Sequence, residues 1–316
     1  MTKAQPGAKS QSFTGIGLTA MMLITDSMYF VFARLLQPFL PPEQATLYSM
    51  TTGMLLVAGF AAYKKRLRFR ILFENLGFFL LIGFLIAFAS NMSYTAMHYI
   101  DPGTASILSQ TTIVFGLVWG LVWLREKLTS RQIIGAVIAI AGVAVITFQK
   151  GDYLRLGSLI VVLSSLSYSF HSAVVKKYGG KFDFLEFYAF RMICNCLCLL
   201  VWAVFTTDFV VPPAGALPYL LLVAAVDICI SRPLYYAVLH RYSISILSIL
   251  LTISPILTVV WSLVLFHTVP TWMQLAGGVA VLSGVAVMAG FPVWKKKPVV
   301  QPVEIPEAAI TEETQG

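Results

Sequence analysis

Five ionisable residues stand inside long apolar runs of this chain, where burying a charge is costly. They are Asp26, His171, Arg191, Asp227 and Arg232. A charged side chain at membrane depth costs about 3 kcal/mol on insertion scales, so it usually faces a partner or a water-filled cavity. Carboxylates and imidazoles can exchange protons, and the planar guanidinium of arginine pairs with carboxylate or phosphate groups. The set therefore favours the binding of a charged solute or a proton, and buried ion pairs are the structural alternative.

Neutral polar residues share helix faces with some of these ionisable residues. Ser164, Tyr168 and His171 form one stripe, because residues three, four and seven apart share a helix face. Asp227 and Arg232 are five apart, about 140° around an α-helix, and are predicted not to pair with each other. Close helix packing is the alternative for the serine and threonine residues. The candidates for lining a solute cavity are Asp26, Asn91, Tyr94, Gln110, Tyr168, His171, Arg191, Asp227, Arg232, Ser248 and Thr252.

The composition is that of a membrane protein. The 316 residues are 58% hydrophobic and 11% charged, whereas a soluble domain carries about 25% charged residues. The net charge of +8 comes from basic residues in short loops, which argues against nucleic acid as a partner. The four cysteines lie within apolar runs, where packing is the expected role. With no nucleotide loop, metal-ligand spacing or nucleophile–base pattern, we expect neither an enzyme nor a bound cofactor or metal.

Apolar runs of about twenty residues fit the thickness of a bilayer. Prolines and basic residues separate them, and with the N-terminus in the cytoplasm 17 lysines and arginines fall on one face and 3 on the other. This bias predicts that both termini are cytoplasmic, in a plasma or inner membrane. The predicted spans are 13–36, 43–63, 75–98, 102–124, 130–148, 157–177, 184–206, 216–239, 243–266 and 271–291.

The second half of the chain repeats the first at a fixed offset of 277 − 135 = 142 residues. Gly135 matches Gly277 and Trp119 matches Trp261 without a gap. Five spans per repeat bring the second copy into the membrane from the opposite side, so an all-α membrane protein of ten transmembrane helices in two inverted repeats is predicted. The predicted divisions are a cytoplasmic tail at 1–12, repeats at 13–148 and 157–290, and a disordered cytoplasmic tail at 295–316.

Several motifs resemble those of the drug/metabolite transporter superfamily, in its ten-helix form with two EamA-like domains. The first half contains AMHYIDPGTASIL and WLREKLTSRQIIG, and the second contains SPILTVVW and SGVAVM. The family pattern has a proline in the fourth helix of each unit and a glutamate at its end. This chain has Pro255 but Thr112–Ile113 in the first half, which argues against a bend in that fourth helix. It has Glu126 but Thr268 in the second half, which argues against a symmetric role for the glutamate.

The resemblance implies a secondary transporter that exports small polar metabolites, such as amino acids or related carboxylates. Alternating access of the two repeats would move the solute, and proton exchange is the implied driving force. A non-transporting membrane scaffold and a lipid translocase are the alternatives. The expected partners are a small-molecule solute and the lipid bilayer, and the sequence leaves a homodimer open.

Overall fold

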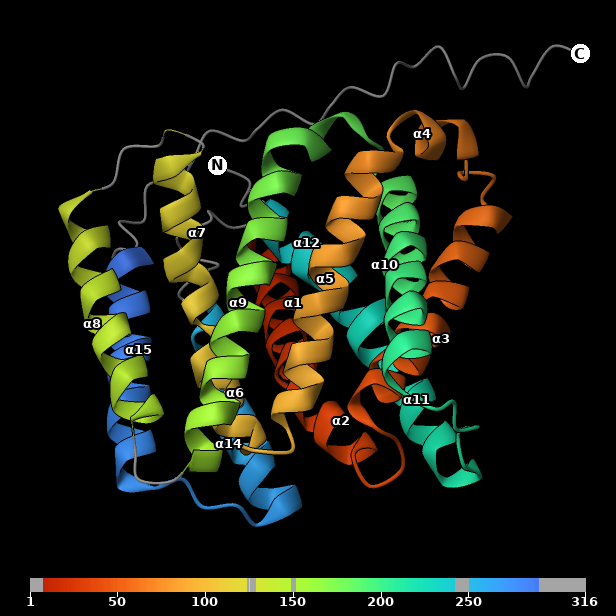
Figure 1. The fold of residues 1–316 in the computed structure, drawn as a ribbon. Coiled ribbons are helices and arrows are strands. Elements are labelled where there is room, and N and C mark those ends of the chain that lie inside the picture. The colour runs from red at the N-terminus through yellow and green to blue at the C-terminus, as the bar shows by residue number, and fades with distance from the viewer. Residues whose placement is uncertain (1–7, 124, 126–128, 149–151, 242–249, 290–316) are drawn as a thin grey trace, which may run out of the picture.

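The computed structural model describes residues 8–123, 125, 129–148, 152–241 and 250–289 as a bundle of helices (Figure 1). Candidate Ser248 and the predicted tail 295–316 lie outside these residues, and the first helix begins at Ala8, inside the predicted tail 1–12. The main helices are α1 (Ala8–Ser27), α2 (Tyr29–Leu36), α3 (Pro42–Tyr63), α4 (Phe69–Glu74), α5 (Leu76–Ala96), α6 (Pro102–Ser109), α7 (Thr111–Val122), α8 (Ser130–Thr147), α9 (Asp152–Tyr178), α10 (Phe184–Thr206), α11 (Leu217–Val223), the π-helix η3 (Ala224–Ser231), α12 (Arg232–Arg241), α14 (Ile253–Phe266) and α15 (Trp272–Ala289).

In the described part of the chain, eight helical segments are long and apolar enough to cross a membrane. They correspond to the first eight predicted spans. The ninth and tenth predicted spans carry shorter apolar helices, at Ile253–Phe266 and Trp272–Met288. Large apolar side chains such as Phe84, Ile133 and Val279 are exposed on the outside of the bundle. Such an exposed apolar surface suits lipid rather than water as the surrounding solvent.

The fourth span is interrupted at Gln110 although it has no proline after Pro102, contrary to the expectation of an unbent helix. Helix α6 ends at Ser109, α7 begins at Thr111, and Gln110 separates them. The Ser109 and Thr111 hydroxyls donate to the carbonyls of Ser106 and Leu108, at 2.7 and 2.8 Å. Hydroxyls that bond back to the preceding turn compete with helical hydrogen bonds and often bend a helix. Thr252, the position 142 residues after Gln110, likewise precedes the first residue of α14.

The first span is also interrupted, at Met28 between α1 and α2. Thr25 and Ser27 stand just before the break, and their hydroxyls donate back to the carbonyls of Met21 and Ile24. The same competition therefore accounts for this break. It places irregular backbone beside Asp26, at the depth of a candidate site residue.

The hydrogen bonds that cap the start of α8 are repeated at the start of α15. The Thr129 hydroxyl accepts from Gln132 N at 3.4 Å, while Gln132 Oε1 accepts from Thr129 N at 2.8 Å, which forms a capping box. Thr271 and Gln274 make the same two bonds at 3.2 and 2.6 Å. Capping satisfies backbone donors that the first helical turn leaves free. The sequence repeat therefore extends to the hydrogen bonds that begin these helices.

Helices α8 and α15 are in backbone contact through glycines. A methyl group placed on Gly135 would stand 2.4 Å from the Gly284 carbonyl, and one on Gly142 would stand 2.6 Å from the Gly277 carbonyl. The two helices run antiparallel, because the later glycine of α8 faces the earlier glycine of α15. Adding 142 to Gly135 and Gly142 gives Gly277 and Gly284, so each contact becomes the other when the repeats are exchanged.

The tryptophans of the two repeats show the same reciprocity. Trp119 of α7 donates from Nε1 to the Ser169 hydroxyl of α9, at 3.1 Å. Trp261 of α14 donates to the Ser27 hydroxyl of α1, also at 3.1 Å. Trp261 is residue 119 + 142 and Ser169 is residue 27 + 142. Each repeat therefore holds a serine of the other repeat through the equivalent indole.

Candidate functional site

The charged residues of the membrane interior meet between helices of both repeats. Asp26 comes from α1 of the first repeat, whereas His171, Arg191, Asp227 and Arg232 come from α9, α10, η3 and α12 of the second. Asp227 lies within electrostatic range of Asp26, Arg191 and Arg232. His171 lies within range of both arginines. We call these five residues the charged cluster, and the fold brings together all five of the ionisable residues predicted from the sequence.

Asp227 and Arg232 form an ion pair, so the prediction that they do not pair was wrong. Arg232 Nη2 lies 3.6 Å from Asp227 Oδ1. The prediction assumed an α-helix, but Ala224–Ser231 is a π-helix, in which hydrogen bonds join residues five apart. Residues five apart therefore fall on successive turns of the same side. Pro233 explains the change locally, since it has no N–H and its ring would clash with the carbonyl four residues before it in an α-helix.

Tyr188 links this π-helix to Arg191, and the sequence reasoning missed it. Its hydroxyl donates to the Ile228 carbonyl at 3.2 Å, and the residue five positions after Ile228 is Pro233, which cannot donate. The Arg191 guanidinium carbon lies 4.8 Å from the centre of the Tyr188 ring, in cation–π geometry. The sequence did contain a signal for this contact: Tyr188 stands three positions before Arg191, and residues three apart share a helix face.

Buried polar atoms without a hydrogen-bond partner among the described residues gather around the cluster. Most buried polar groups in proteins are hydrogen-bonded, so such a concentration marks a place built for something other than packing. His171 also stacks on Tyr168, with ring centres 5.7 Å apart. The unpartnered atoms here are both ring nitrogens of His171, Arg191 Nε, both amide atoms of Asn195 and Asp227 Oδ1. Candidate Asn91 is buried in α5, and its Oδ1 is also unpartnered among the described residues.

Asp26 is bound by the opposite repeat. The Ser254 hydroxyl of α14 donates to Asp26 Oδ2 at 2.8 Å. Thr258, one turn further along α14, donates to the carbonyl of Ser27 at 2.9 Å. Helix α14 therefore holds the irregular backbone around Met28 through its side chains. Neither Ser254 nor Thr258 was among the predicted site residues.

Of the other neutral candidates, Tyr94 lies within electrostatic range of Asp227, whereas Gln110 and Thr252 are at helix breaks. Tyr94 is buried and packs edge-on against Tyr29, with ring centres 6.1 Å apart. Gln110 and Thr252 stand at the two equivalent helix breaks described above. The structure therefore places Tyr94 in an aromatic contact and the other two at bends, and it joins Tyr168 to the charged cluster through His171.

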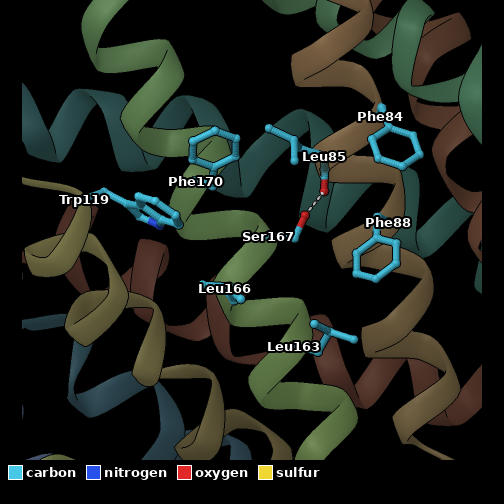
Figure 2. Close-up of a pocket in the computed structure, with 8 residues that line it drawn as sticks. All are labelled: Phe84, Leu85, Phe88, Trp119, Leu163, Leu166, Ser167 and Phe170. Carbon is cyan, nitrogen blue, oxygen red and sulfur yellow. Dashed lines mark hydrogen bonds between the residues drawn. The ribbon is translucent and has the colours of Figure 1, made fainter. Parts of the chain in front are cut away.

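A groove of about 310 Å³ lies between α5, α7 and α9, and it is apolar (Figure 2). Its one polar lining residue, Ser167, donates to the Leu85 carbonyl at 2.8 Å. No predicted site residue lines it, and it offers a solute no free polar group. The lining residues are Phe84, Leu85, Phe88, Trp119, Leu163, Leu166, Ser167 and Phe170.

Two reciprocal side-chain contacts join α3 and α10 to loops at opposite ends of the bundle. Glu186, at the start of α10, accepts from the backbone N of Arg68 at 3.0 Å and from Arg68 Nη2 at 2.9 Å. Gln44, at the start of α3, accepts from the backbone N of Val210 at 3.0 Å. Glu186 is residue 44 + 142 and Val210 is residue 68 + 142, so the two contacts are equivalent. We call them the Arg68 closure and the Val210 closure.

The closures differ in charge. Both Glu186 and Gln44 are almost completely buried. Hydrogen bonds from Arg68 to Glu186, together with the charge of that carboxylate, raise the pKa of the Arg68 guanidinium above its usual value. Gln44 instead donates to the Thr207 hydroxyl at 3.2 Å, and all its contacts are neutral. Figure 1 places α4, which follows Arg68, and the beginning of α11 at opposite ends of the bundle.

Comparison with known proteins agrees with this duplicated arrangement. The model of the EamA-like transporter family matches residues 13–148 and again residues 155–290. The chain belongs to the EamA-like transporter family. It is therefore a multi-pass membrane protein of a transporter family, and the two matched segments start and end close to the two predicted repeats.

Relatives of this EamA-like protein are named as uncharacterized transporters. YdfC of Bacillus subtilis (strain 168) is 24% identical over 258 residues, which cover 77% of this chain and 80% of YdfC. YvbV of the same organism is 22% identical over 191 residues, covering 59% of this chain and 63% of YvbV. One solved crystal structure shares the fold with a TM-score of 0.60 at 13% identity, covering 87% of this chain and 97% of the other.

Proposed function

We propose that this EamA-like protein is a secondary transporter that exports small polar metabolites, such as amino acids or related carboxylates. One observation carries the proposal: a charged cluster in which His171, Arg191 and Asp227 are buried, with unpartnered polar atoms around it, lies between helices of both repeats. Buried charges are expensive in a membrane and usually mark a pathway for solutes or ions. Membership of the EamA-like transporter family favours transport rather than catalysis as the function of this site.

The proposed mechanism is alternating access between two inverted repeats. Its support is the reciprocity of contacts, since exchanging residues n and n + 142 converts Gly135–Gly284 into Gly277–Gly142. A two-fold axis that exchanges two antiparallel helices is perpendicular to them, and so lies in the plane of the membrane they cross. Inverted repeats of this kind place the binding site at the repeat interface and move solute by rocking one repeat against the other.

The two closures fit this mechanism as gates. Alternating access requires one end of the pathway to open while the other stays shut. The Arg68 and Val210 closures join α3 and α10 at opposite ends, and each uses equivalent residues of the two repeats. We propose that breaking the Arg68 closure opens the pathway to the cytoplasm, because the excess of basic residues in the loops on this side predicts a cytoplasmic face. Both termini then lie in the cytoplasm of a cell with the protein in its plasma or inner membrane.

The proposed solute is anionic or zwitterionic. Arg191 and Arg232 of the second repeat correspond to Ser49 and Ser90 of the first, so the positive charge is not part of what the repeats share. The guanidinium of arginine matches the geometry of a carboxylate. Proton exchange is the proposed driving force, because two carboxyl groups, those of Asp26 and Asp227, lie inside the membrane spans, where ionisable groups usually mark a pathway for solutes or protons.

Purified protein in proteoliposomes tests the proposal. We expect radiolabelled amino acids or small carboxylic acids to accumulate when a pH gradient is imposed, and accumulation to stop when a protonophore collapses the gradient. Protein-free liposomes are the control for leakage. Movement of fluorescent phospholipids without any solute would favour a lipid translocase instead. If neither solute nor lipid moved, the transport proposal would fail and a scaffold would be the better account.

A further inference from the structure

Arg191 and Arg232 lie at similar depths in their predicted membrane spans, but the structure gives them different surroundings. Arg232 follows the π-helix η3 directly and forms the ion pair with Asp227. The rest of its environment includes Asp26 and the hydroxyl-bearing rings of Tyr168 and Tyr188 within electrostatic range. A buried carboxylate without this cation would be strongly unfavourable. Arg232 is therefore accounted for as the counter-ion that lets Asp227 be buried.

Arg191 makes no such ion pair, although Asp227 lies within electrostatic range of it. It is 8% exposed, and it forms no ion pair with any described residue within 4.0 Å. Its Nε lacks a hydrogen-bond acceptor among the described residues. The ring of Tyr188 holds its guanidinium carbon at 4.8 Å, and Tyr188 is fixed in turn by its bond to the Ile228 carbonyl. The guanidinium is thus held in a defined place while part of its hydrogen-bonding capacity is unused.

Further donors belong to the same surroundings. Asn195 lies one turn after Arg191 on the same face of α10, and neither of its amide atoms has a partner among the described residues. His171 is within electrostatic range of Arg191, and both its ring nitrogens are unpartnered there. An imidazole offers at least one N–H in either protonation state, and the amide offers two. Both residues are at least nine-tenths buried.

We propose that Arg191, with Asn195 and His171, binds the carboxylate of the transported solute, whereas Arg232 has a structural role. This inference rests on the proposed transport function and deepens it. One guanidinium with neutral donors suits a single negative charge better than a phosphate dianion. Hydrogen bonds between a guanidinium and a carboxylate are among the strongest in proteins, because they are charge-assisted and can be bidentate.

Matched pairs of carboxylates and their amides provide the test. The probes are lactate and lactamide, phenylacetate and phenylacetamide, and leucine and leucinamide, measured by thermal unfolding of purified protein and by uptake into proteoliposomes. We expect carboxylates to raise the unfolding temperature of the wild type, since a ligand that binds only the native state stabilises it. Arg191→Gln should weaken the apparent affinity for carboxylates about 10- to 100-fold and leave the amides unchanged.

Three further variants keep the test specific. Arg191→Lys retains the charge without the planar fork, so it should keep part of the carboxylate affinity. Arg232→Gln should lower the unfolding temperature without solute, because Asp227 loses its counter-ion, while the preference for carboxylates over amides persists. Arg70→Gln removes an exposed arginine that pairs with Glu74 at the surface, and it should behave as wild type.

The failures of the two proposals are distinguishable. If the wild type moves solute and Arg191→Gln handles carboxylates as the wild type does, the Arg191 inference is overturned and the transport function stands. The same holds if Arg232→Gln, but not Arg191→Gln, loses the preference for carboxylates, or if the amides bind as well as the acids. If the wild type moves neither member of any pair, the transport function fails and the inference falls with it.

Discussion

Replacing Gly135 with alanine should destabilise the protein by roughly 0.5–2 kcal/mol, although alanine is normally the better helix former. The new methyl group would stand 2.4 Å from the Gly284 carbonyl oxygen and 2.7 Å from the Met288 backbone nitrogen. Ordinary contact begins at 3.4 Å, so α8 and α15 must separate by about 1 Å. Overpacking costs about 1–3 kcal/mol, and alanine returns about 0.5–1 kcal/mol as the better helix former.

The repeat sets the controls for this prediction. Gly277→Ala changes the equivalent position, where the methyl group would stand 2.7 Å from the Gly142 carbonyl, so it should cost about as much. Gly116→Ala in α7 meets nothing within 4 Å and should stabilise by about 0.5–1 kcal/mol. A Gly135→Ala, Gly284→Ala double variant should cost less than the two single changes together, because one separation of the helices relieves both contacts.

Thermal unfolding of the purified variants in one detergent measures these differences directly. The expected order of unfolding temperatures is Gly116→Ala above wild type, and wild type above Gly135→Ala and Gly277→Ala. If Gly135→Ala were as stable as Gly116→Ala, the close contact of α8 with α15 would be refuted. A large difference between Gly135→Ala and Gly277→Ala would contradict the reciprocity of the two repeats, whatever the cost of each.

Glu186→Gln removes the negative charge from the Arg68 closure, and we expect it to increase thiol labelling of a cysteine placed near that end of the pathway by roughly two- to fivefold. The effect should be modest because the Arg68 side chain of this pair is 67% exposed, so water screens its charge. Gln44→Ala should increase labelling at the opposite end instead, and labelling of the same end by both variants would contradict their roles as alternate closures. Partial burial and the charge of Arg34 lower the pKa of His98 from its usual 6.5, against a smaller opposing effect of Glu43. The His98 imidazole therefore binds a proton more readily in the unfolded protein than in the folded one. The free energy of unfolding that His98 contributes is fully present above about pH 6.5 and is lost as the pH falls. His98→Gln should flatten this fall in unfolding temperature, and an unchanged pH profile would exclude the histidine as its source.

The sequence predicted eight of the membrane-spanning helices because such helices depend on local properties. Twenty consecutive apolar residues are enough to cross a bilayer as a helix, since lipid offers the backbone no other hydrogen-bond partner. The first eight predicted spans are helices of that kind. The internal repeat was visible because both copies kept the residues that need a special contact, such as Gly135 and Gly277 at the α8–α15 interface. The ionisable candidates stood out for the same reason, because a charge is rare in an apolar run.

What the sequence could not determine is how the backbone departs from a regular helix and which side chains then meet. A helical wheel separates Asp227 from Arg232, but Pro233 favours a π-helix that brings them to 3.6 Å. Gln110 interrupts a helix without a proline, through hydroxyls that bond back to the preceding turn. The roles of the two arginines likewise depend on contacts between distant segments. Only the tertiary structure could pair Arg232 with a carboxylate and leave Arg191 on the Tyr188 ring, because these contacts depend on where helices pack rather than on spacing along the chain.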